Sequence, residues 1–316
     1  MFFLQTKTTN GVTQNWKKHR TASKKIYVPD LLYFIMYADD TNIFLSHQSI
    51  NTLECTLNIE MEKLVKWMQV NRLSLNVKKT KAIFFSNNPT VNGVSVTIGG
   101  TEVEFVDKIK FLGVIIDSKL QWRDHIDFIT NKLAKIAGQF SKIKGKICRK
   151  TFVTLYYTFV YPLLIYGNIV WGKAAKVHLN KIHLMQKRII RIIFNAKYLD
   201  HTEPLFQTAS VLNVFQLYVY NVCIFMYLMR KGTFENMFDS LFSKNLDFHS
   251  HLTRHNFNYV MPYCRTVLRQ RTIAYTGAYY FNHVNDIIND VFDKHSLSAF
   301  KRNMRNVILE NKVDAM

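Results

Sequence analysis

FIMYADDTNIFLS, residues 34–46, sets two adjacent carboxylates, Asp39 and Asp40, between two apolar runs. This pattern is typical of a β-hairpin, with LLYFIMY as the first strand and TNIFLS as the second. The first strand is apolar on both faces, which predicts a central, covered position in a sheet. Neighbouring carboxylates repel each other and lose hydration on burial, so the turn needs a compensating positive charge.

A divalent cation would supply this charge, because Mg²⁺ prefers carboxylate oxygens together with the phosphate oxygens of a substrate. Two such ions held about 4 Å apart stabilise both the attacking and the leaving oxygen of a phosphoryl transfer. Asp39 and Asp40 are therefore candidate metal ligands and catalytic residues. The alternative is an Asp-Asp turn that only ends a strand, since Asp is a common turn residue.

The segment after the hairpin has the spacing of an amphipathic helix. Its apolar residues recur at three- and four-residue intervals, which predicts a helix over residues 51–70. Asn51 and Glu54 are spaced as a capping box at its beginning.

Strand patterns follow this helix. A strand is predicted over residues 82–86 and another over 108–117, and a second hairpin over 94–106 has Gly99 and Gly100 at its tip. Strands and one helix in this order predict an α+β sheet domain.

From Trp122 onward the pattern is helical, and acidic residues are nearly absent between Ile129 and Asp200. Basic residues recur at mostly helical spacing in two segments of this region. The candidates for contact with a nucleic-acid backbone are Lys132, Lys135, Lys142, Lys146, Lys187, Arg188 and Arg191. An ordinary solvated helix face is the alternative. A solvated helix face usually carries both positive and negative side chains. Negative side chains are nearly absent here, so contact with phosphate is favoured.

The 316 residues are enough for two domains, and a hydrophobic content of 48% excludes a disordered chain. The net charge of +20 indicates a polyanionic partner, nucleic acid first and an anionic membrane surface second. Two uncharged stretches, residues 152–172 and 204–229, have the length of a membrane span. Their Asn, Gln, Tyr and Pro residues favour buried helices over the alternative of a two-span membrane protein.

YADD inside an apolar hairpin resembles the catalytic hairpin of reverse transcriptases. WMQVNRLSLNVKKTKAIFF, residues 67–85, is similar to the segment after the active site in reverse transcriptases of non-LTR (LINE-type) retrotransposons. KFLGVIIDSKLQWRDHI, residues 110–126, resembles their primer-gripping hairpin and the entry to the thumb. Further segments through residue 312 resemble, in the same order, the helical region that follows.

The resemblance implies a partial polymerase palm, an antiparallel sheet with a helix, followed by a mainly α-helical thumb and C-terminal region. We predict the C-terminal half of a palm over residues 29–118, a thumb-like helical region over 119–200 and a helical C-terminal region over 201–316. Residues 1–28 are polar and basic without periodicity, and are expected to be a poorly ordered leader. The implied activity is that of an RNA-directed DNA polymerase, a nucleotidyltransferase that uses Mg²⁺ or Mn²⁺, an RNA template and a DNA primer.

The resemblance also implies roles for single residues of the hairpin. Asp39 would be the metal ligand that faces the nucleotide, and Asp40 would stand beside it. Tyr37 would pack beneath the turn, near the primer end.

Residues after the hairpin would contact the nucleotide and the primer. Lys79 would lie near the triphosphate and protonate the departing pyrophosphate, with Lys78 or Lys81 as alternatives. The residues that would shape the primer grip are Phe111, Leu112 and Gly113. Ordinary core packing is the alternative for the two apolar members of this set.

One part of the family pattern is missing. Reverse transcriptases need a further metal-binding carboxylate on a strand upstream of this hairpin, and fingers that hold template and nucleotide. The one acidic residue before Asp39 is Asp30, at the start of the same strand and about 30 Å away if the strand is extended. No Pro-Gln-Gly segment precedes YADD. We therefore predict a chain that begins within a palm and does not polymerise DNA alone.

Two alternatives follow from this gap: a non-catalytic remnant that binds nucleic acid, and a decayed reading frame whose product does not fold. A full-length reverse transcriptase is a possible further partner, and no membrane is expected. Without a secretory signal, the chain is expected to be intracellular, in the cytoplasm or the nucleus, and not secreted.

Overall fold

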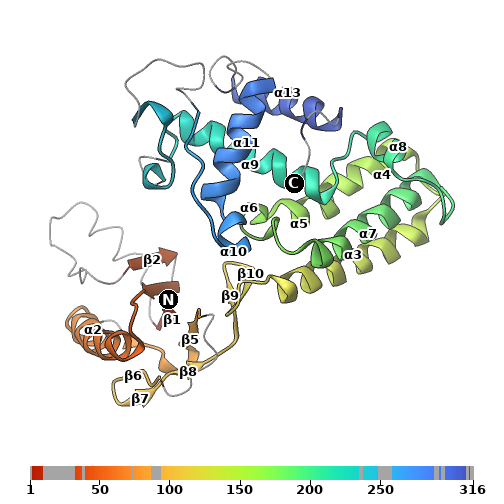
Figure 1. Cartoon of the computed structure of the whole chain (residues 1–316). Coiled ribbons are helices and arrows are strands. Elements are labelled where there is room, and N and C mark those ends of the chain that lie inside the picture. The colour runs from red at the N-terminus through yellow and green to blue at the C-terminus, as the bar shows by residue number, and fades with distance from the viewer. Residues whose placement is uncertain are drawn as a thin grey trace. The chain divides into compact units, whose positions relative to one another are not determined.

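The computed structural model describes residues 2–9, 33–37, 40–72, 74–86, 94–234, 238–247, 258–287, 292, 296–310 and 313. The chain divides into two compact units, Met1–Asp124 and His125–Met316. The first is built on a sheet with one long helix, and the second consists of helices (Figure 1). The predicted α+β fold class is confirmed.

The first unit contains a sheet with the strand order β2-β3-β1-β5-β8, and β4 also pairs with β1. The bounds of these strands are β1 (Phe2–Thr9), β2 (Tyr33–Tyr37), β3 (Asp40–Leu45), β4 (Ser74–Leu75), β5 (Lys81–Phe84) and β8 (Glu104–Phe105). β2 and β3 are antiparallel and form the hairpin that the opening motif predicts. β5 and β8 are parallel, whereas β1 is antiparallel to each of its neighbours.

The position of β2 differs from the prediction. It lies at one end of the described strand order and not in the centre. Its side chains at Tyr33, Ile35 and Tyr37 are exposed to solvent. The prediction that β2 is a central, covered strand, made from its apolar residues on both faces, is therefore wrong.

β1 is the second departure, because the basic leader predicted over residues 1–28 includes this strand. The prediction of a poorly ordered leader is wrong for residues 2–9, and residues 10–28 lie outside the described part of the chain. The FFLQTKTT sequence is rich in Phe and Thr, which favour strands. Phe3 is buried between the neighbouring strands and stacks on Phe44, with ring centroids 4.6 Å apart.

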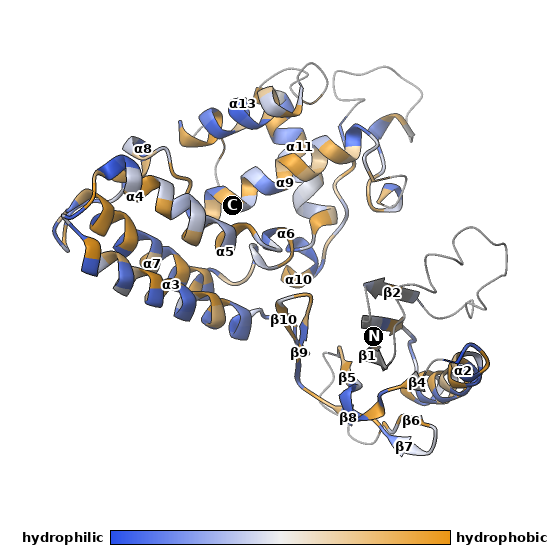
Figure 2. Ribbon diagram, turned by 180° about the vertical axis from the view of Figure 1, so that it is seen from behind, coloured by the Kyte–Doolittle hydropathy of each residue, from blue (hydrophilic) through white to orange (hydrophobic). Residues whose placement is uncertain are grey.

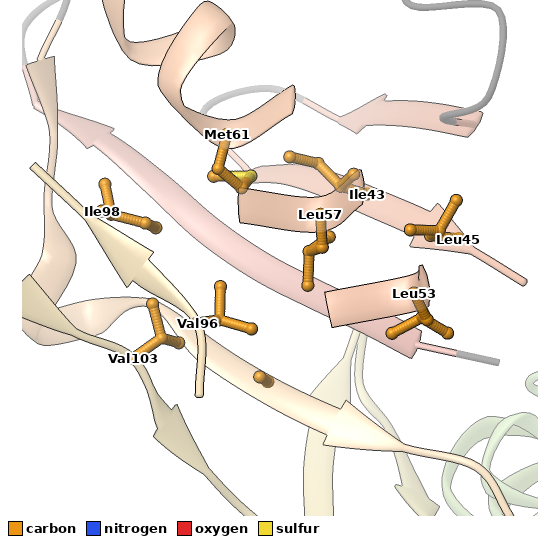
Figure 3. Packing of buried hydrophobic residues seen from close by; sticks show 9 residues of the cluster. Ile43, Leu45, Leu53, Leu57, Met61, Val96, Ile98 and Val103 are labelled. Atoms are coloured by element: carbon orange, nitrogen blue, oxygen red, sulfur yellow. The ribbon is translucent and has the colours of Figure 1, made fainter. Parts of the chain in front are cut away.

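The helix α2 (Ile50–Val70) covers this sheet through one apolar face. Figure 3 shows the core cluster that it forms with β3, with β5, with β6 (Thr97–Ile98) and with Val96 and Val103 near β6. The cluster consists of Ile43, Leu45, Leu53, Leu57, Met61, Ala82, Val96, Ile98 and Val103. The burial of these side chains stabilises the sheet by the hydrophobic effect.

The N-cap of α2 differs from the predicted one. Ser49 is the N-cap and its side chain accepts a hydrogen bond from the Thr52 N–H, so the predicted capping box at Asn51 and Glu54 is wrong. Glu54 instead accepts a hydrogen bond from the Ser95 N–H at 2.9 Å, which ties the helix to the chain before β6.

Two short hairpins complete the first unit. β6 pairs with β7 (Thr101–Glu102) across Gly99 and Gly100, which both have positive φ, as predicted. β9 (Lys108–Phe111) pairs with β10 (Val114–Asp117). The single strand that the pattern predicts over 108–117 is therefore a hairpin, as the resemblance of residues 110–126 to a primer-gripping hairpin implies.

Helices follow from Arg123 to Leu309, with several short turns of helix between them. In chain order they are α3 (Arg123–Ile143), α4 (Arg149–Leu155), η2 (Tyr156–Val160), α5 (Tyr161–Ile165), α6 (Asn168–Trp171), α7 (Lys176–Phe194), α8 (Glu203–Thr208), α9 (Val214–Arg230), η3 (Asp239–Leu241), η4 (Asn245–Asp247), α10 (Val267–Gln270), α11 (Ile273–Ile287) and α13 (Leu297–Leu309). α9 packs against α5, α6, α7, α11 and α13 and is the most buried of them (Figure 1).

A buried amide connects three of these helical elements. Gln186 of α7 is 0% exposed, and its Nε2 donates to Tyr156 Oη at 2.8 Å and to the Leu212 carbonyl at 3.2 Å. Its Oε1 accepts from the Val214 N–H at the beginning of α9, at 2.8 Å. One side chain therefore satisfies polar groups of η2, α9 and the segment between α8 and α9.

The two uncharged stretches do not form membrane spans. Residues 152–172 are divided among α4, η2, α5 and α6, and residues 204–229 between α8 and α9. Within the part of the chain that the structure describes, no helix combines the length and apolar character needed to cross a bilayer.

Candidate functional site

The predicted catalytic hairpin is formed by β2 and β3, and its backbone register pairs Tyr37 with Asp40. Asp39 lies outside the described residues, and Asp40 is the first residue of β3. Tyr37 is 63% exposed. The hairpin thus exists as predicted, whereas the role of its carboxylates stays a prediction.

The strand next to the hairpin is β1, and its register decides which residues lie opposite the acidic turn. Lys7 pairs with Asp40, Thr6 with Thr41 and Gln5 with Asn42. The FFLQTKTT sequence of β1 contains no carboxylate. The neighbouring upstream strand therefore places a lysine opposite Asp40.

A pair of divalent ions needs more ligands than one hairpin turn supplies. Two ions need carboxylates from more than one strand, because each ion has a charge of +2 and prefers anionic oxygen ligands. Among the residues that the structure describes, no group of three His, Cys, Asp or Glu side chains is placed to hold a metal.

The three candidate lysines lie in and beside η1 (Val77–Lys79), which begins after the N-cap Asn76. Lys78 and Lys79 are exposed. Lys81 is the first residue of β5, and its Nζ lies 3.5 Å from a carboxylate oxygen of Glu104 on β8. This ion pair gives Lys81 a structural partner and leaves Lys78 and Lys79 as the candidates for phosphate contact.

The predicted primer grip is the turn between β9 and β10. Leu112 and Gly113 have φ of 43° and 86°, and two consecutive positive φ values are typical of a type I′ hairpin turn. Glycine adopts this conformation easily, whereas leucine does so at a cost of about 1 kcal/mol. Phe111 packs edge-on against Phe3 at 5.7 Å between ring centroids, which supports the core-packing alternative for Phe111.

The lysines of α3 form an exposed face. Lys135 and Lys142 project from the side of the helix opposite to its buried residues Leu133 and Ala137. Lys132 is also exposed but lies at the flank of the helix, with its Nζ 4.3 Å from the centre of the Phe128 ring. Lys146 is also exposed and follows the helix in the next turn of chain. Figure 2 shows hydrophilic and hydrophobic residues alternating along α3 and α7, as expected for amphipathic helices. We call Lys132, Lys135, Lys142 and Lys146 the α3 lysine face.

The basic residues of α7 have more varied surroundings. Arg188 is exposed, and Lys187 is half-buried. Arg191 donates two hydrogen bonds to the Asp200 carbonyl, at 3.1 and 3.0 Å, so it also fixes the loop after α7. Lys181 pairs with Asp127 of α3 at 2.6 Å.

Sequence reasoning missed one group of cations. Lys173 and Lys176, before and at the beginning of α7, line a cavity together with Arg271 at the end of α10. The helical-spacing pattern could not find them, because Arg271 lies far from the two lysines in the sequence.

Comparison with known proteins gives relatives of one kind. The chain is 28% identical to "RNA-directed DNA polymerase from mobile element jockey" of Drosophila melanogaster over 172 residues, which are 54% of this chain and 19% of that protein. It is 26% identical to "Probable RNA-directed DNA polymerase from transposon BS" of the same species over 170 residues, 51% of this chain and 18% of that protein.

A "Retrovirus-related Pol polyprotein from type-1 retrotransposable element R1" of Bradysia coprophila is 20% identical over 148 residues, 46% of this chain and 15% of that protein. No family model matches the chain. No solved structure matches it. The chain spans about a fifth of the length of the jockey and BS proteins. The relatives of this chain are RNA-directed DNA polymerases of non-LTR retrotransposons, which confirms the resemblance predicted from the YADD hairpin and the segments after it.

Proposed function

We propose that this chain is a segment of a retrotransposon reverse transcriptase that binds nucleic acid and does not synthesise DNA by itself. The observation that carries the proposal is the α3 lysine face, which is exposed. It lies in a stretch of sequence that has no Asp or Glu between Ile129 and Asp200. A single-sign face of this kind releases counterions when it binds a phosphate backbone. Its natural ligands would be an RNA template and a DNA primer.

The absence of synthesis is proposed from the register of β1. Lys7 opposite Asp40 and the lack of a carboxylate in β1 leave the acidic turn without the second strand of ligands that two-ion chemistry requires. Mg²⁺ or Mn²⁺ would neutralise phosphate charge in an intact polymerase, and Asp39 and Asp40 would supply part of its ligands. A full-length reverse transcriptase copy could supply the missing part.

Primer extension tests this part of the proposal. We expect the purified chain with primer, template, nucleotides and Mg²⁺ to incorporate no more nucleotide than its Asp39→Asn variant. Incorporation by the natural chain that is lost in Asp39→Asn would contradict the proposal. RNA binding that is unchanged by Mg²⁺ and by Asp39→Asn would favour a remnant in which the carboxylates have no role.

A salt titration tests the nucleic-acid interface. Replacing Lys135 and Lys142 together by Glu should weaken binding of RNA about tenfold or more and reduce the slope of log K against log salt concentration by about 2, because each lysine neutralises about one phosphate. The matched control replaces two lysines outside this face, Lys66 of α2 and Lys301 of α13, by Glu, with the same change in net charge. Equal losses in both double variants would indicate a general effect of net charge and would contradict a specific interface.

A further inference from the structure

A cavity of about 310 Å³ lies in the helical unit, among α6, α7, α9, α10 and α11. Both ribbon views place α6 and α10 beside each other and near α9 and α11 (Figures 1 and 2). This volume is at the lower end of the range typical of small-ligand sites. The cavity thus has room for a group of the size of one nucleotide.

The charge of the cavity wall is strongly positive. Lys173, Lys176 and Arg271 line it, and among its described lining residues there is no Asp or Glu. The pKa of Lys173 is lowered from its ordinary value by burial first and then by the positive charges of Arg271 and Lys176. Cations that repel one another in a concave, half-buried place are stabilised by a bound anion.

The N-terminus of α7 adds to the positive electrostatic potential of the cavity. Its N-cap is Ala175, which has no side chain that could accept from the first N–H groups of the helix. Lys176 and Leu179 of this first turn line the cavity. The N-terminus of a helix of this length carries a partial positive charge, which strengthens the attraction for an anion.

Another part of the wall is aromatic. Tyr275 and Tyr279 of α11 line the cavity and are half-buried, and Tyr279 also stacks on His283, with ring centroids 5.9 Å apart. The wall behind them is rigid, because Tyr218 Oη donates to Thr276 Oγ1 at 2.8 Å and both side chains are buried. Half-exposed rings beside cations are the elements with which proteins hold single-stranded nucleic acid, through base stacking and phosphate contact.

We propose that this cavity binds one nucleotide unit of a single-stranded nucleic acid, with the phosphate at Lys173, Lys176 and Arg271 and the base against Tyr275 or Tyr279. The inference rests on the nucleic-acid binding proposed above and adds a defined pocket to the α3 lysine face. A free mononucleotide has the same chemistry and should enter the pocket more weakly than a strand, because it lacks the contacts outside it.

The test measures fluorescence anisotropy of a labelled single-stranded RNA of about ten nucleotides on the full chain. Arg271→Gln should weaken binding about tenfold, since a charge-assisted contact to phosphate is lost. The matched control is Arg269→Gln, on the same short helix but not in the wall of the cavity, and it should change affinity about twofold or less. Thermal unfolding of both variants verifies that they fold.

Tyrosine variants test the aromatic wall without a change of charge. Tyr275→Leu with Tyr279→Leu should weaken binding of the same RNA about tenfold, whereas Tyr275→Phe with Tyr279→Phe should keep most of the affinity. Uridine monophosphate should compete more strongly than inorganic phosphate with the RNA. Equal competition by the two would overturn the role of the base.

The outcomes separate this inference from the proposed function. If the chain binds the RNA and Arg271→Gln behaves like Arg269→Gln, the pocket is overturned and the α3 lysine face stands. If the natural chain binds no RNA, the proposed function fails. In that case the thermal unfolding of the chain with uridine monophosphate decides about the pocket. If the nucleotide does not raise the unfolding temperature, the pocket is overturned as well. If it raises the unfolding temperature of Arg269→Gln but not that of Arg271→Gln, the pocket is supported.

Discussion

Replacing Gln186 by Met should lower the free energy of unfolding of the helical unit by about 4 kcal/mol, although the two side chains have similar shapes. The substitution leaves the Tyr156 hydroxyl, the Leu212 carbonyl and the Val214 N–H without their buried partner. Each buried group left unsatisfied costs about 1–3 kcal/mol. Urea unfolding of the full chain, followed by circular dichroism, measures the change.

A double-mutant cycle shows whether this network is the cause. Tyr156→Phe alone should cost about 1 kcal/mol, and close to nothing once Gln186 is already Met, because the hydroxyl has then lost its partner. Gln139→Met, on the exposed side of α3, is the matched control and should stay within about 0.5 kcal/mol of the natural chain. Additive costs of the Gln186 and Tyr156 substitutions would contradict the network.

Lowering the pH from 7 to about 4 should cost the helical unit about 2 kcal/mol for each of two histidines. His125 is 2% exposed and lies edge-on to Trp171, and His183 lies between Phe206 and Phe215. Burial lowers the pKa of both from 6.5 to about 4, helped by Lys132 near His125 and by Lys187 near His183.

The direction of this pH effect on stability follows from the number of protons that the folded and the unfolded chain bind. Below pH 6.5 the unfolded chain protonates these histidines while the folded chain keeps them neutral, so protons favour unfolding. Their contribution to stability is complete above pH 6.5 and is lost between 6.5 and about 4. Carboxylates also titrate in this window, so the histidine share is obtained by comparison with variants.

His183→Phe removes one of the two titrating groups and keeps an aromatic ring between its neighbours. The fall in unfolding temperature between pH 6.5 and 4 should become smaller in this variant. His201→Phe, at an exposed position, is the matched control and should leave the fall unchanged. The same pH dependence in both variants would show that His183 is not the cause.

Local patterns predicted several elements of the fold. The β2–β3 hairpin, α2 and the β6–β7 hairpin depend on residues close together in the chain, and their spacing was visible. The N-cap of α2 was predicted two residues too late, because Ser49 and Asn51 are both good capping residues and the pattern does not choose between them. The apolar pattern alone predicts one strand for β9 and β10, because the turn at Leu112 and Gly113 has only one glycine, and only the family resemblance indicates the hairpin.

Local sequence patterns could not predict the pairing of strands that lie far apart in the chain. β1 is separated from its partners β3 and β5 by long stretches of chain, so its sequence, which has no periodicity, gives no signal of its place in the sheet. Of the candidate site, the residues on one hairpin or one helix could be predicted. The cavity at Lys173 and Arg271 could not, since only the packing of α10 and α11 against α7 and α9 brings its walls together.

The central place of β1 has a consequence for how this protein is made. β1 precedes its ladder partners, residues 40–45 and 81–84, in the chain, so this part of the sheet can close only after both have been synthesised. Without residues 2–9, β3 and β5 would become two open borders able to pair with strands of other molecules. β1 is thus the strand that protects both of these edges from pairing with other molecules.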